Sequence, residues 1–293
     1  MTAGLPMVPD VRAVPDGASD ARTSRTTSRE ALELLRDRPL VVLTGAGLST
    51  DSGIPDYRGP GSVPRQPMTY QEFRSGPQAR QRYWARVHVG FGRFAGAAPN
   101  DGHRALARLD PELLITQNVD GLHEDAGQRR LVALHGRIAD VVCLDCRATS
   151  PRAALHERLS ELNPGFADRH TQLESRPDGD VELDETAGFV VPGCVACGGV
   201  LKPDVVFFGE NVPAPRVERC YAAVDALADD DGALLVVGSS LTVMSGFRFV
   251  RRAARAGTPV VIVNRGETRG DEHATYKLDV GCSEFLETLV CVP

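Results

Sequence analysis

The sequence predicts an α/β protein built on a doubly wound parallel sheet, with a small zinc-binding module inserted into it. Short apolar runs, each the length of a buried strand, alternate with helical patterns, and this alternation is typical of a parallel sheet covered by helices. Residues 137–203 interrupt it, because they have no long apolar run and contain two Cys-x-x-Cys pairs. We expect a disordered tail over residues 1–28, a sheet domain over 29–136 and 204–293, and a module over 137–203 in which a metal replaces a core.

Charge and hydropathy argue against nucleic-acid binding by bulk charge and against a membrane span. The 293 residues include 33 Lys+Arg and 39 Asp+Glu, a formal net charge of −6, which argues against a nucleic-acid binder that works by bulk charge. The chain has no run of 18 apolar residues, so we expect no membrane span. The first 28 residues lack the apolar segment of a secretory signal. We therefore expect a cytoplasmic protein, in which paired cysteines indicate metal binding.

The elements are expected in the following order. Order begins at residues 27–30, a capping-box pattern, and the helix that follows ends before Pro39. Strands are expected at residues 40–44, 113–116, 233–237 and 259–263, and a helix at 248–256. Each strand is followed by a loop of Gly or polar residues. Because ligands bind outside the carboxyl ends of parallel strands, these loops should form one crevice.

Glycines directly after the first strand predict an anion-binding loop. Gly45 and Gly47 let the backbone approach a pyrophosphate, and the following helix N-terminus favours anions. Thr50 breaks the Gly-x-Gly-x-x-Gly fingerprint of dehydrogenases, so a tight turn without a ligand is the alternative. Residues 54–58 join a proline, an acid, an aromatic ring and a guanidinium, a mixture that suits closure over a cofactor.

A second polar cluster lies at residues 116–123 and 134–136. Its amide, carboxylate and imidazole side chains suit the binding of a sugar and an amide and the movement of protons. His135 is the natural general base, since histidine titrates near neutral pH; a structural histidine is the alternative. The other six of the seven histidines are interpreted as structural.

Two cysteine pairs, Cys143/Cys146 and Cys194/Cys197, predict a structural zinc site. Four thiolates fill a tetrahedral shell and leave no open position. The pairs are 47 residues apart, against ~15–20 in a compact ribbon, so the module should carry an extra excursion. Two separate redox motifs are the alternative, although neither pair is followed by the helix that such a motif requires.

Residues 198–210 form an extended, β-branched segment that ends in Phe-Phe-Gly-Glu. Such a segment can pair with a peptide by strand addition. An ordinary core strand is the alternative.

Taken together, these motifs make the chain resemble the sirtuins, the family of NAD-dependent protein-lysine deacylases. The matching motifs are Gly-Ala-Gly-Leu-Ser (45–49), Gly-Ile-Pro-Asp-Tyr-Arg (53–58), Thr-Gln-Asn-Val-Asp (116–120), Leu-His-Gly (134–136), the cysteine pairs, Lys-Pro-Asp-Val-Val-Phe-Phe-Gly-Glu (202–210), Gly-Ser-Ser (238–240) and Val-Asn-Arg-Gly (263–266). They occur in the family's order and span roughly residues 38–290. The long gap between the cysteine pairs and the segment 82–86 resemble the class II branch.

The resemblance implies a Rossmann-like domain and a small domain with one structural Zn²⁺, with the co-substrate NAD and an acyl-lysine peptide meeting in the cleft between them. It implies NAD contacts from Gly45, Ala46, Gly47, Asp56, Tyr57, Arg58, Gln117, Asn118, Val119, Asp120, Gly238, Ser239, Ser240, Asn264, Arg265, Gly266 and Cys282. It implies peptide contacts from Val205, Val206, Phe207, Phe208, Gly209 and Glu210.

The resemblance also implies a mechanism. The acyl oxygen attacks the ribose as nicotinamide leaves, and His135 then deprotonates a ribose hydroxyl, with Asn118 and Asp120 completing the catalytic set. The acyl group ends on ADP-ribose. Two alternatives stay open: a protein mono-ADP-ribosyltransferase and a non-catalytic NAD-sensing module. Sirtuins of this length are often monomers, and we expect a monomer here.

Tyr83 and Arg86 predict a preference for acidic or long acyl groups over acetyl. Residues three apart share a helix face, so both side chains should point into the acyl pocket, where an arginine can grip a carboxylate. Sirtuins that remove succinyl or glutaryl groups resemble this chain in carrying a Tyr-x-x-Arg pair here. A solvated surface helix is the alternative.

Overall fold

The larger unit of the computed structural model is a six-stranded parallel sheet. The structure describes residues 18–56, 67–94, 96–170, 183 and 185–291. The sheet has the order β3-β2-β1-β7-β8-β9. Its strands are β1 (Leu40–Thr44), β2 (Leu113–Thr116), β3 (Leu131–Ala133), β7 (Ala233–Val237), β8 (Val260–Val263) and β9 (Tyr276–Leu278). This is the order of a Rossmann fold, whose ligand crevice opens where the strand order reverses, here between β1 and β7. The predicted doubly wound sheet is confirmed.

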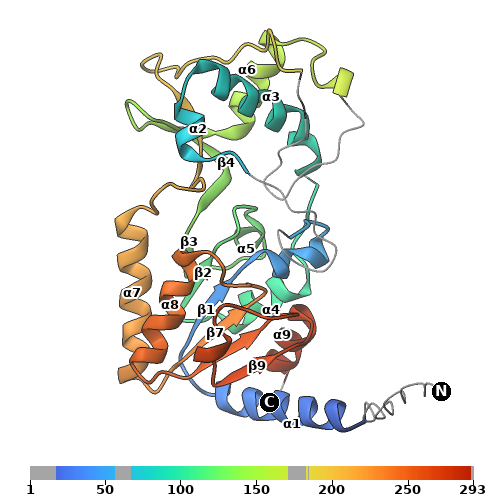
Figure 1. The fold of residues 1–293 in the computed structure, drawn as a ribbon, viewed down its shortest axis with the longest axis vertical. Coiled ribbons are helices and arrows are strands. Elements are labelled where there is room, and N and C mark those ends of the chain that lie inside the picture. The colour runs from blue at the N-terminus through green and yellow to red at the C-terminus, as the bar shows by residue number, and fades with distance from the viewer. Residues whose placement is uncertain (1–17, 57–66, 95, 171–182, 184, 292–293) are drawn as a thin grey trace, which may run out of the picture.

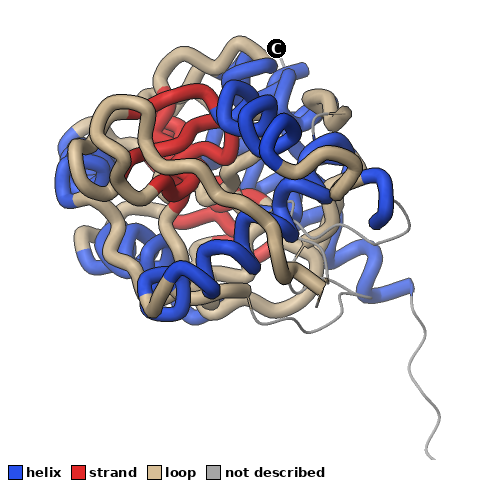
Figure 2. The backbone as a smooth tube through the Cα atoms, turned by 90° about the horizontal axis from the view of Figure 1, so that it is seen from above, coloured by secondary structure: helices blue, strands red, loops and turns tan. Residues whose placement is uncertain are grey.

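Helices cover both faces of this sheet, because its strands are apolar on both sides. Alternate residues of β1 belong to different cores: Val41 and Leu43 lie in one cluster, and Leu40 and Val42 in the other. The first cluster is completed by α7 (Ala214–Asp229) and α8 (Met244–Arg255), and the second by α1 (Ala18–Leu35), α4 (Asp101–Leu109) and α9 (Cys282–Cys291). Figure 1 shows these two groups on opposite sides of the sheet, and Figure 2 shows the strands enclosed between helices.

The first helix begins earlier than the sequence predicted. It starts at Ala18, so the expected capping box at residues 27–30 lies inside the helix, and the tail expected over residues 1–28 overlaps the helix from residue 18 onward. The physical reason is that no Gly or Pro occurs between residues 18 and 35, so nothing stops the helix until Gly17. Residues 1–17 lie outside the described part of the chain.

The smaller unit has an apolar core of its own, which corrects the expectation that a metal would replace one. Its antiparallel sheet has the order β5-β4-β6, with β4 (Gly136–Cys143), β5 (Thr149–Pro151) and β6 (Leu201–Val205). Three helices pack on it: α2 (Tyr70–Arg74), α3 (Pro77–Phe94) and α6 (Arg152–Leu162). Phe73 and Trp84, from α2 and α3, are fully buried beside Val141 and Leu159.

The sequence division placed α2 and α3 with the larger unit, whereas their apolar side chains pack in the smaller one. Sequence order hid this, because two separate segments of the chain build one core. The remaining elements are short: α5 (Leu122–Asp125), η1 (Ala46–Ser52), η2 (Asp168–His170) and η3 (Asp271–His273).

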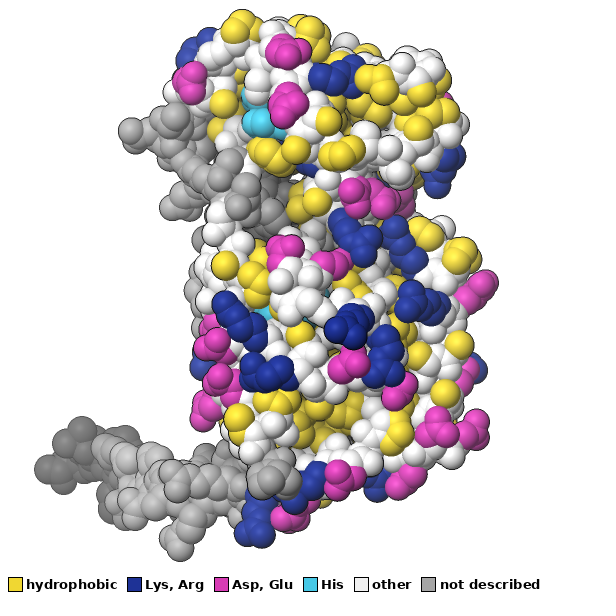
Figure 3. All heavy atoms as spheres, turned by 180° about the vertical axis from the view of Figure 1, so that it is seen from behind, with side chains coloured by type: hydrophobic (Ala, Val, Ile, Leu, Met, Phe, Trp, Pro, Cys, Tyr) yellow, Lys and Arg dark blue, Asp and Glu magenta, His cyan; other side chains and the backbone are white. Residues whose placement is uncertain are grey.

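The surface carries charges of both signs. On the face in Figure 3, Lys and Arg side chains of the larger unit are interspersed with Asp and Glu. Exposed ion pairs occur at the surface, such as Arg252 with Asp225 at 2.6 Å. Within the described residues, none of the helices combines the length and apolar character that crossing a membrane requires.

Candidate active site

A cavity of about 640 Å³ lies where the two units meet, at the carboxyl ends of β1, β2, β7 and β8. Most of the residues that the sequence singled out line it: Gly45, Ala46, Gly47, Asp56, Tyr83, Gln117, Asn118, Val119, Asp120, His135, residues 205–210, Gly238, Ser239, Ser240, Asn264, Arg265 and Gly266. Among the described residues, Arg86 and Cys282 do not line it. The predicted Tyr57 and Arg58 lie outside the described part of the chain.

The loops after β1 and β7 approach so closely that glycine is required at both. The Gly47 N–H donates to the Gly238 carbonyl at 2.9 Å. A Cβ added to Gly45 would lie 2.7 Å from that carbonyl oxygen, and Gly238 has a φ of +63°. A Cβ at either position meets backbone atoms that cannot turn away. The glycines therefore shape one wall of the cavity by letting two backbones touch.

A hydrogen-bonded network joins the loops after β1 and β2. The side-chain nitrogen of Asn118, Nδ2, donates to the Gly45 carbonyl at 3.1 Å and to Ser49 Oγ at 3.0 Å. Ser49 in turn donates to Asp120 Oδ2 at 2.7 Å, and the Leu122 N–H donates to Asp120 Oδ1 at 3.0 Å. Burial raises the pKa of the Asp120 carboxyl against these hydrogen bonds, which lower it. The network holds an amide and a carboxylate at fixed positions in the cavity wall.

Gln117 extends this network to β7. Its side-chain nitrogen donates to the Thr44 carbonyl at 3.2 Å and to Ser239 Oγ at 2.8 Å. A Cβ added to Gly246, on α8, would lie 2.5 Å from Gln117 Oε1. The loops after β1, β2 and β7 and the start of α8 therefore form one packed frame around the cavity.

His135 follows β3 and is bonded at both ring nitrogens. Nδ1 lies 2.9 Å from the Gln117 carbonyl oxygen, and Nε2 lies 2.7 Å from Ser245 Oγ. A carbonyl only accepts, so Nδ1 carries the proton and Nε2 presents its lone pair. Burial lowers the pKa of His135 to about 4; the Gln117 carbonyl opposes this, and the positive charge of Arg216 adds to it. At neutral pH the imidazole is therefore neutral and able to accept a proton.

The other buried histidines do not line the cavity. His88, His103 and His123 are at most 3% exposed, and burial is the main cause that lowers the pKa of each. His123 Nε2 lies 3.0 Å from Thr44 Oγ1, beneath the loop after β1. Their positions agree with the structural role expected for them.

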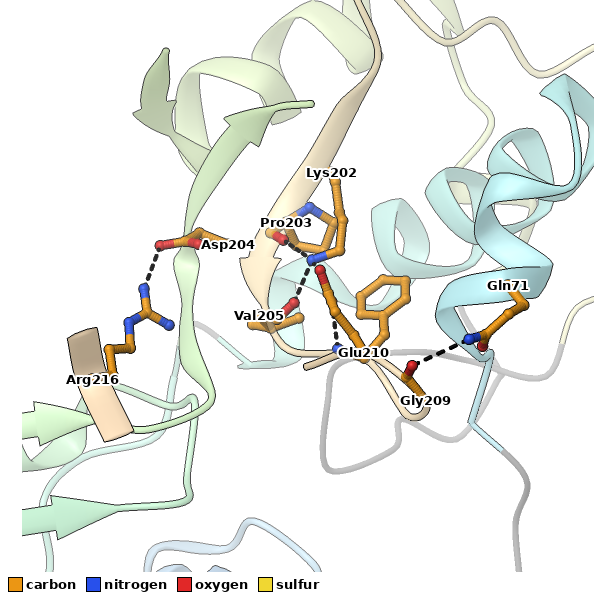
Figure 4. Close-up of polar contacts among 9 residues, drawn as sticks. Gln71, Lys202, Pro203, Asp204, Val205, Gly209, Glu210 and Arg216 are labelled. Carbon is orange, nitrogen blue, oxygen red and sulfur yellow. Dashed lines mark hydrogen bonds and ion pairs between the residues drawn. The ribbon is translucent and has the colours of Figure 1, made fainter. Parts of the chain in front are cut away.

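Lys202 fixes the segment that follows β6. Its side chain is 4% exposed, and Nζ lies 3.0 Å from Glu210 Oε2. The ammonium also donates to the carbonyls of Pro203 and Val205. The same Glu210 oxygen accepts the Phe207 N–H at 2.9 Å. Figure 4 shows Lys202, Val205 and Glu210 tied together in this way. Burial lowers the pKa of Lys202, and the Glu210 carboxylate opposes that shift.

The segment 205–210 is also anchored to α2. Gln71 Nε2 donates to the Gly209 carbonyl at 3.1 Å (Figure 4), and the Tyr70 N–H donates to the Phe208 carbonyl at 2.9 Å. Phe207 packs edge-on against Phe73, with ring centroids 5.3 Å apart. The segment is therefore held in a defined shape along the cavity, with Phe208 40% exposed.

The four paired cysteines come together as predicted. Their sulfur atoms all lie within 4.8 Å of one another, with Cys143 and Cys197 at 3.6 Å and Cys146 and Cys194 at 3.8 Å. Sulfurs arranged tetrahedrally about 2.3 Å from a zinc ion are about 3.8 Å apart. The cluster thus fits a structural Zn²⁺. All four cysteines are described by the structure and none of them lines the cavity. The metal site is therefore separate from the cavity.

Tyr83 and Arg86 meet different surroundings. Tyr83 lines the cavity and is 7% exposed. Its ring packs against that of Phe207, with the ring centroids 5.2 Å apart. Arg86 Nε donates to the Leu183 carbonyl at 2.9 Å. The two side chains leave the same helix, but the structure brings only Tyr83 to the cavity.

Sequence reasoning gave no role to several residues that line the cavity. Ser49 ends the Gly-Ala-Gly-Leu-Ser motif, and a hydroxyl so close to the glycine loop was a usable signal. Met244, Ser245 and Arg248 lie on α8. A helical sequence pattern does not show that these three residues line a cavity, because only the packing of α8 on the Gln117 loop brings them there.

Comparisons with known proteins agree with this geometry. The model of the Sir2 family matches residues 45–245. NAD-dependent protein deacetylase 1 of Mycobacterium avium is 53% identical over 272 residues, covering 90% of this chain and 95% of that protein. NAD-dependent protein deacetylase 1 of Streptomyces coelicolor is 51% identical over 279 residues, covering 92% and 91%. A solved complex of Sir2 with p53 peptide and NAD⁺ is 31% identical, with a TM-score of 0.70 over 89% of this chain and 96% of that one.

Proposed function

The chain belongs to the Sir2 family of NAD-dependent protein deacetylases, and we propose that it removes acetyl groups from protein lysines by transferring them to ADP-ribose, with release of nicotinamide. One observation carries the proposal. A neutral imidazole, that of His135, lines the same cavity as the Gly45–Gly47 loop and the segment 205–210. A base, a pyrophosphate loop and a peptide-pairing segment are what this transfer needs in one place.

NAD would be held by the loops at the carboxyl ends of the strands. The close-packed glycines Gly45, Gly47 and Gly238 suit the pyrophosphate. Ser239, Ser240 and residues 264–266 line the same cavity and suit the ribose and adenosine. When bound, NAD supplies a ribose carbon that becomes reactive as its bond to nicotinamide breaks. Asn118 and Asp120, fixed through Ser49, would orient the nicotinamide amide and the ribose beside it.

The acetyl-lysine peptide would pair with residues 205–210 by strand addition. Lys202, Glu210 and Gln71 hold this segment, which supports a preformed peptide seat. The lysine side chain would then pass along Phe207 and Tyr83, two aromatic rings at the cavity wall. His135 would take the proton of the sugar hydroxyl that accepts the acetyl group, through the lone pair of Nε2. Cys143, Cys146, Cys194 and Cys197 would hold a structural Zn²⁺ that stabilises the smaller unit, away from the cavity in which the transfer takes place.

Acyl preference is the finer part of the proposal. Because Tyr83 lines the cavity, it supports a pocket in which the end of the acyl chain contacts this side chain. A preference for acidic acyl groups further requires the Arg86 guanidinium to exchange its contact with Leu183 for the cavity. Membership of the class II branch and a cytoplasmic, monomeric state complete what we propose. The matched test is kcat/KM on acetyl-, succinyl- and glutaryl-lysine peptides for the wild type and Arg86→Met: a loss confined to the acidic peptides supports the preference, and equal losses contradict it.

The function itself is tested by the products formed from NAD and an acetyl-lysine peptide. Mass spectrometry should find O-acetyl-ADP-ribose and deacetylated peptide in equal amounts with nicotinamide. ADP-ribose attached to protein would identify a mono-ADP-ribosyltransferase instead. Bound NAD with no product would identify a non-catalytic sensing module.

A further inference from the structure

The lone pair of His135 Nε2 has a partner, the hydroxyl of Ser245, at 2.7 Å. His135 follows β3, and Ser245 lies in the first turn of α8, 110 residues further along the chain. Because Nδ1 donates its proton to the Gln117 carbonyl, Nε2 can only accept, and the Ser245 O–H must be the donor. The imidazole is thus fixed from both sides, by a backbone carbonyl and by a hydroxyl.

Helix capping does not explain this serine. The N-cap of α8 is Val243, and no side chain caps the helix. Ser245 is 9% exposed and lines the cavity together with His135. Its hydroxyl therefore acts on the imidazole rather than on the helix end.

We propose that Ser245 is a positioning residue for the general base: its hydroxyl holds the His135 imidazole in the tautomer and orientation in which Nε2 accepts a proton. This inference rests on the proposed function, since it assigns a role within that reaction. The sugar hydroxyl replaces the Ser245 hydroxyl as the donor to Nε2, and its O–H bond then breaks as the N–H bond forms. The Ser245 hydroxyl turns to a backbone carbonyl of the preceding turn, as serine hydroxyls near helix starts readily do.

The basicity of His135 depends on the charged groups around it and on its hydrogen bond with Ser245. Arg216, from α7, is the cation that acts on the imidazole, and it is paired with Asp204 at 3.2 Å. Asp120, from the loop after β2, and Arg248, from α8, line the same cavity. A donor to Nε2 stabilises the neutral imidazole, so removing it should make the ring more basic. The loss of one hydrogen bond of ordinary strength corresponds to a rise of about half to one pKa unit.

The direct test is ¹⁵N NMR of the full chain labelled at histidine, followed over pH without substrate. His135→Ala assigns the resonances of His135. In the wild type, the Nε2 shift should be that of an unprotonated nitrogen and Nδ1 that of a protonated one. Ser245→Ala should raise the pKa of His135 by about half to one unit, Ser245→Thr should restore the wild-type value, and Ser160→Ala, on the surface of α6, should change nothing. A wild-type ring protonated on Nε2, or an unchanged pKa in Ser245→Ala, would overturn the proposal.

Kinetics give the second readout. Ser245→Ala should lower kcat by about 2–13-fold, because a ring that has lost one hydrogen bond of ordinary strength is held less often in the reactive orientation, while KM for NAD and peptide stays within about twofold. Ser245→Thr should recover most of kcat. If the wild type forms no product, the proposed function fails, and the NMR titration still decides the role of Ser245. If the wild type is active and Ser245→Ala has an unchanged kcat, the role of Ser245 fails alone.

Discussion

Breaking the ion pair between Lys202 and Glu210 should destabilise the smaller unit by an amount that depends on which partner is removed. Glu210→Gln leaves the Lys202 ammonium, whose side chain is 4% exposed, without its anion. Removing one partner of a buried pair costs about 3–5 kcal/mol. Two carbonyl acceptors remain for Nζ, so we expect about 2–4 kcal/mol for this variant.

The reverse change should cost less. Lys202→Met leaves Glu210, which is 21% exposed and still accepts the Phe207 N–H, and we expect about 1–2 kcal/mol. The double variant should be closer to Lys202→Met than to the sum of the two single changes. Arg137→Met is the matched control, since Arg137 pairs with Glu124 at the surface, where the two side chains are 46% and 30% exposed, and should cost less than ~1 kcal/mol.

Urea unfolding followed by tryptophan fluorescence suits this comparison. The chain has one tryptophan, Trp84, which is fully buried in the smaller unit and donates to the Leu201 carbonyl at 3.2 Å, next to Lys202. The reasoning is refuted if Glu210→Gln is no more destabilising than Arg137→Met. It is also refuted if Lys202→Met is the more damaging of the two changes.

Three further predictions follow from the structure. Cys194→Ser should lose its zinc and unfold the smaller unit; zinc retained at one ion per chain, with an unchanged melting temperature, would contradict a structural site. Gly45→Ala should weaken NAD binding, measured by calorimetry, because its Cβ would lie 2.7 Å from the Gly238 carbonyl oxygen; unchanged affinity would show that the two loops separate without loss. The pKa values of His88, His103 and His135 are lowered from 6.5 to about 4, so the unfolded chain binds more protons between these values, and the free energy of unfolding should fall as pH drops from 6.5 towards 4. Urea midpoints between pH 7 and 5 test this, and a flat profile would contradict neutral buried histidines.

Local patterns were sufficient to predict four of the six strands of the parallel sheet, but not the three-residue edge strands β3 and β9. Each strand expected from an apolar run is present in the structure, because a strand buried on both faces needs apolar residues throughout, and such a run is visible in one dimension. Residues at the ends of these strands line one cavity for the same reason: parallel topology brings their carboxyl ends to one edge. The metal site could also be predicted from the two cysteine pairs, since four thiolates that bind one ion must lie close together.

Tertiary packing determined what the sequence hid. Phe73 and Trp84 complete the core of a unit whose sheet lies more than fifty residues further along the chain, and no local pattern shows that partnership. Arg86 shares a helix face with Tyr83, but its Nε donates to the Leu183 carbonyl, a partner contributed by the excursion between the cysteine pairs. Ser245 becomes relevant only because α8 packs against the loop that carries Gln117.

The central claim is that His135 acts as the base that lets the acetyl group move from lysine to ADP-ribose. A peptide with ¹³C-acetyl-lysine and NAD, turned over by wild type and by His135→Ala, tests it most directly by mass spectrometry. The wild type should transfer the label to ADP-ribose, and His135→Ala should do so about two to four orders of magnitude more slowly while keeping the wild-type melting temperature. Transfer by a folded His135→Ala at near the wild-type rate would contradict the account.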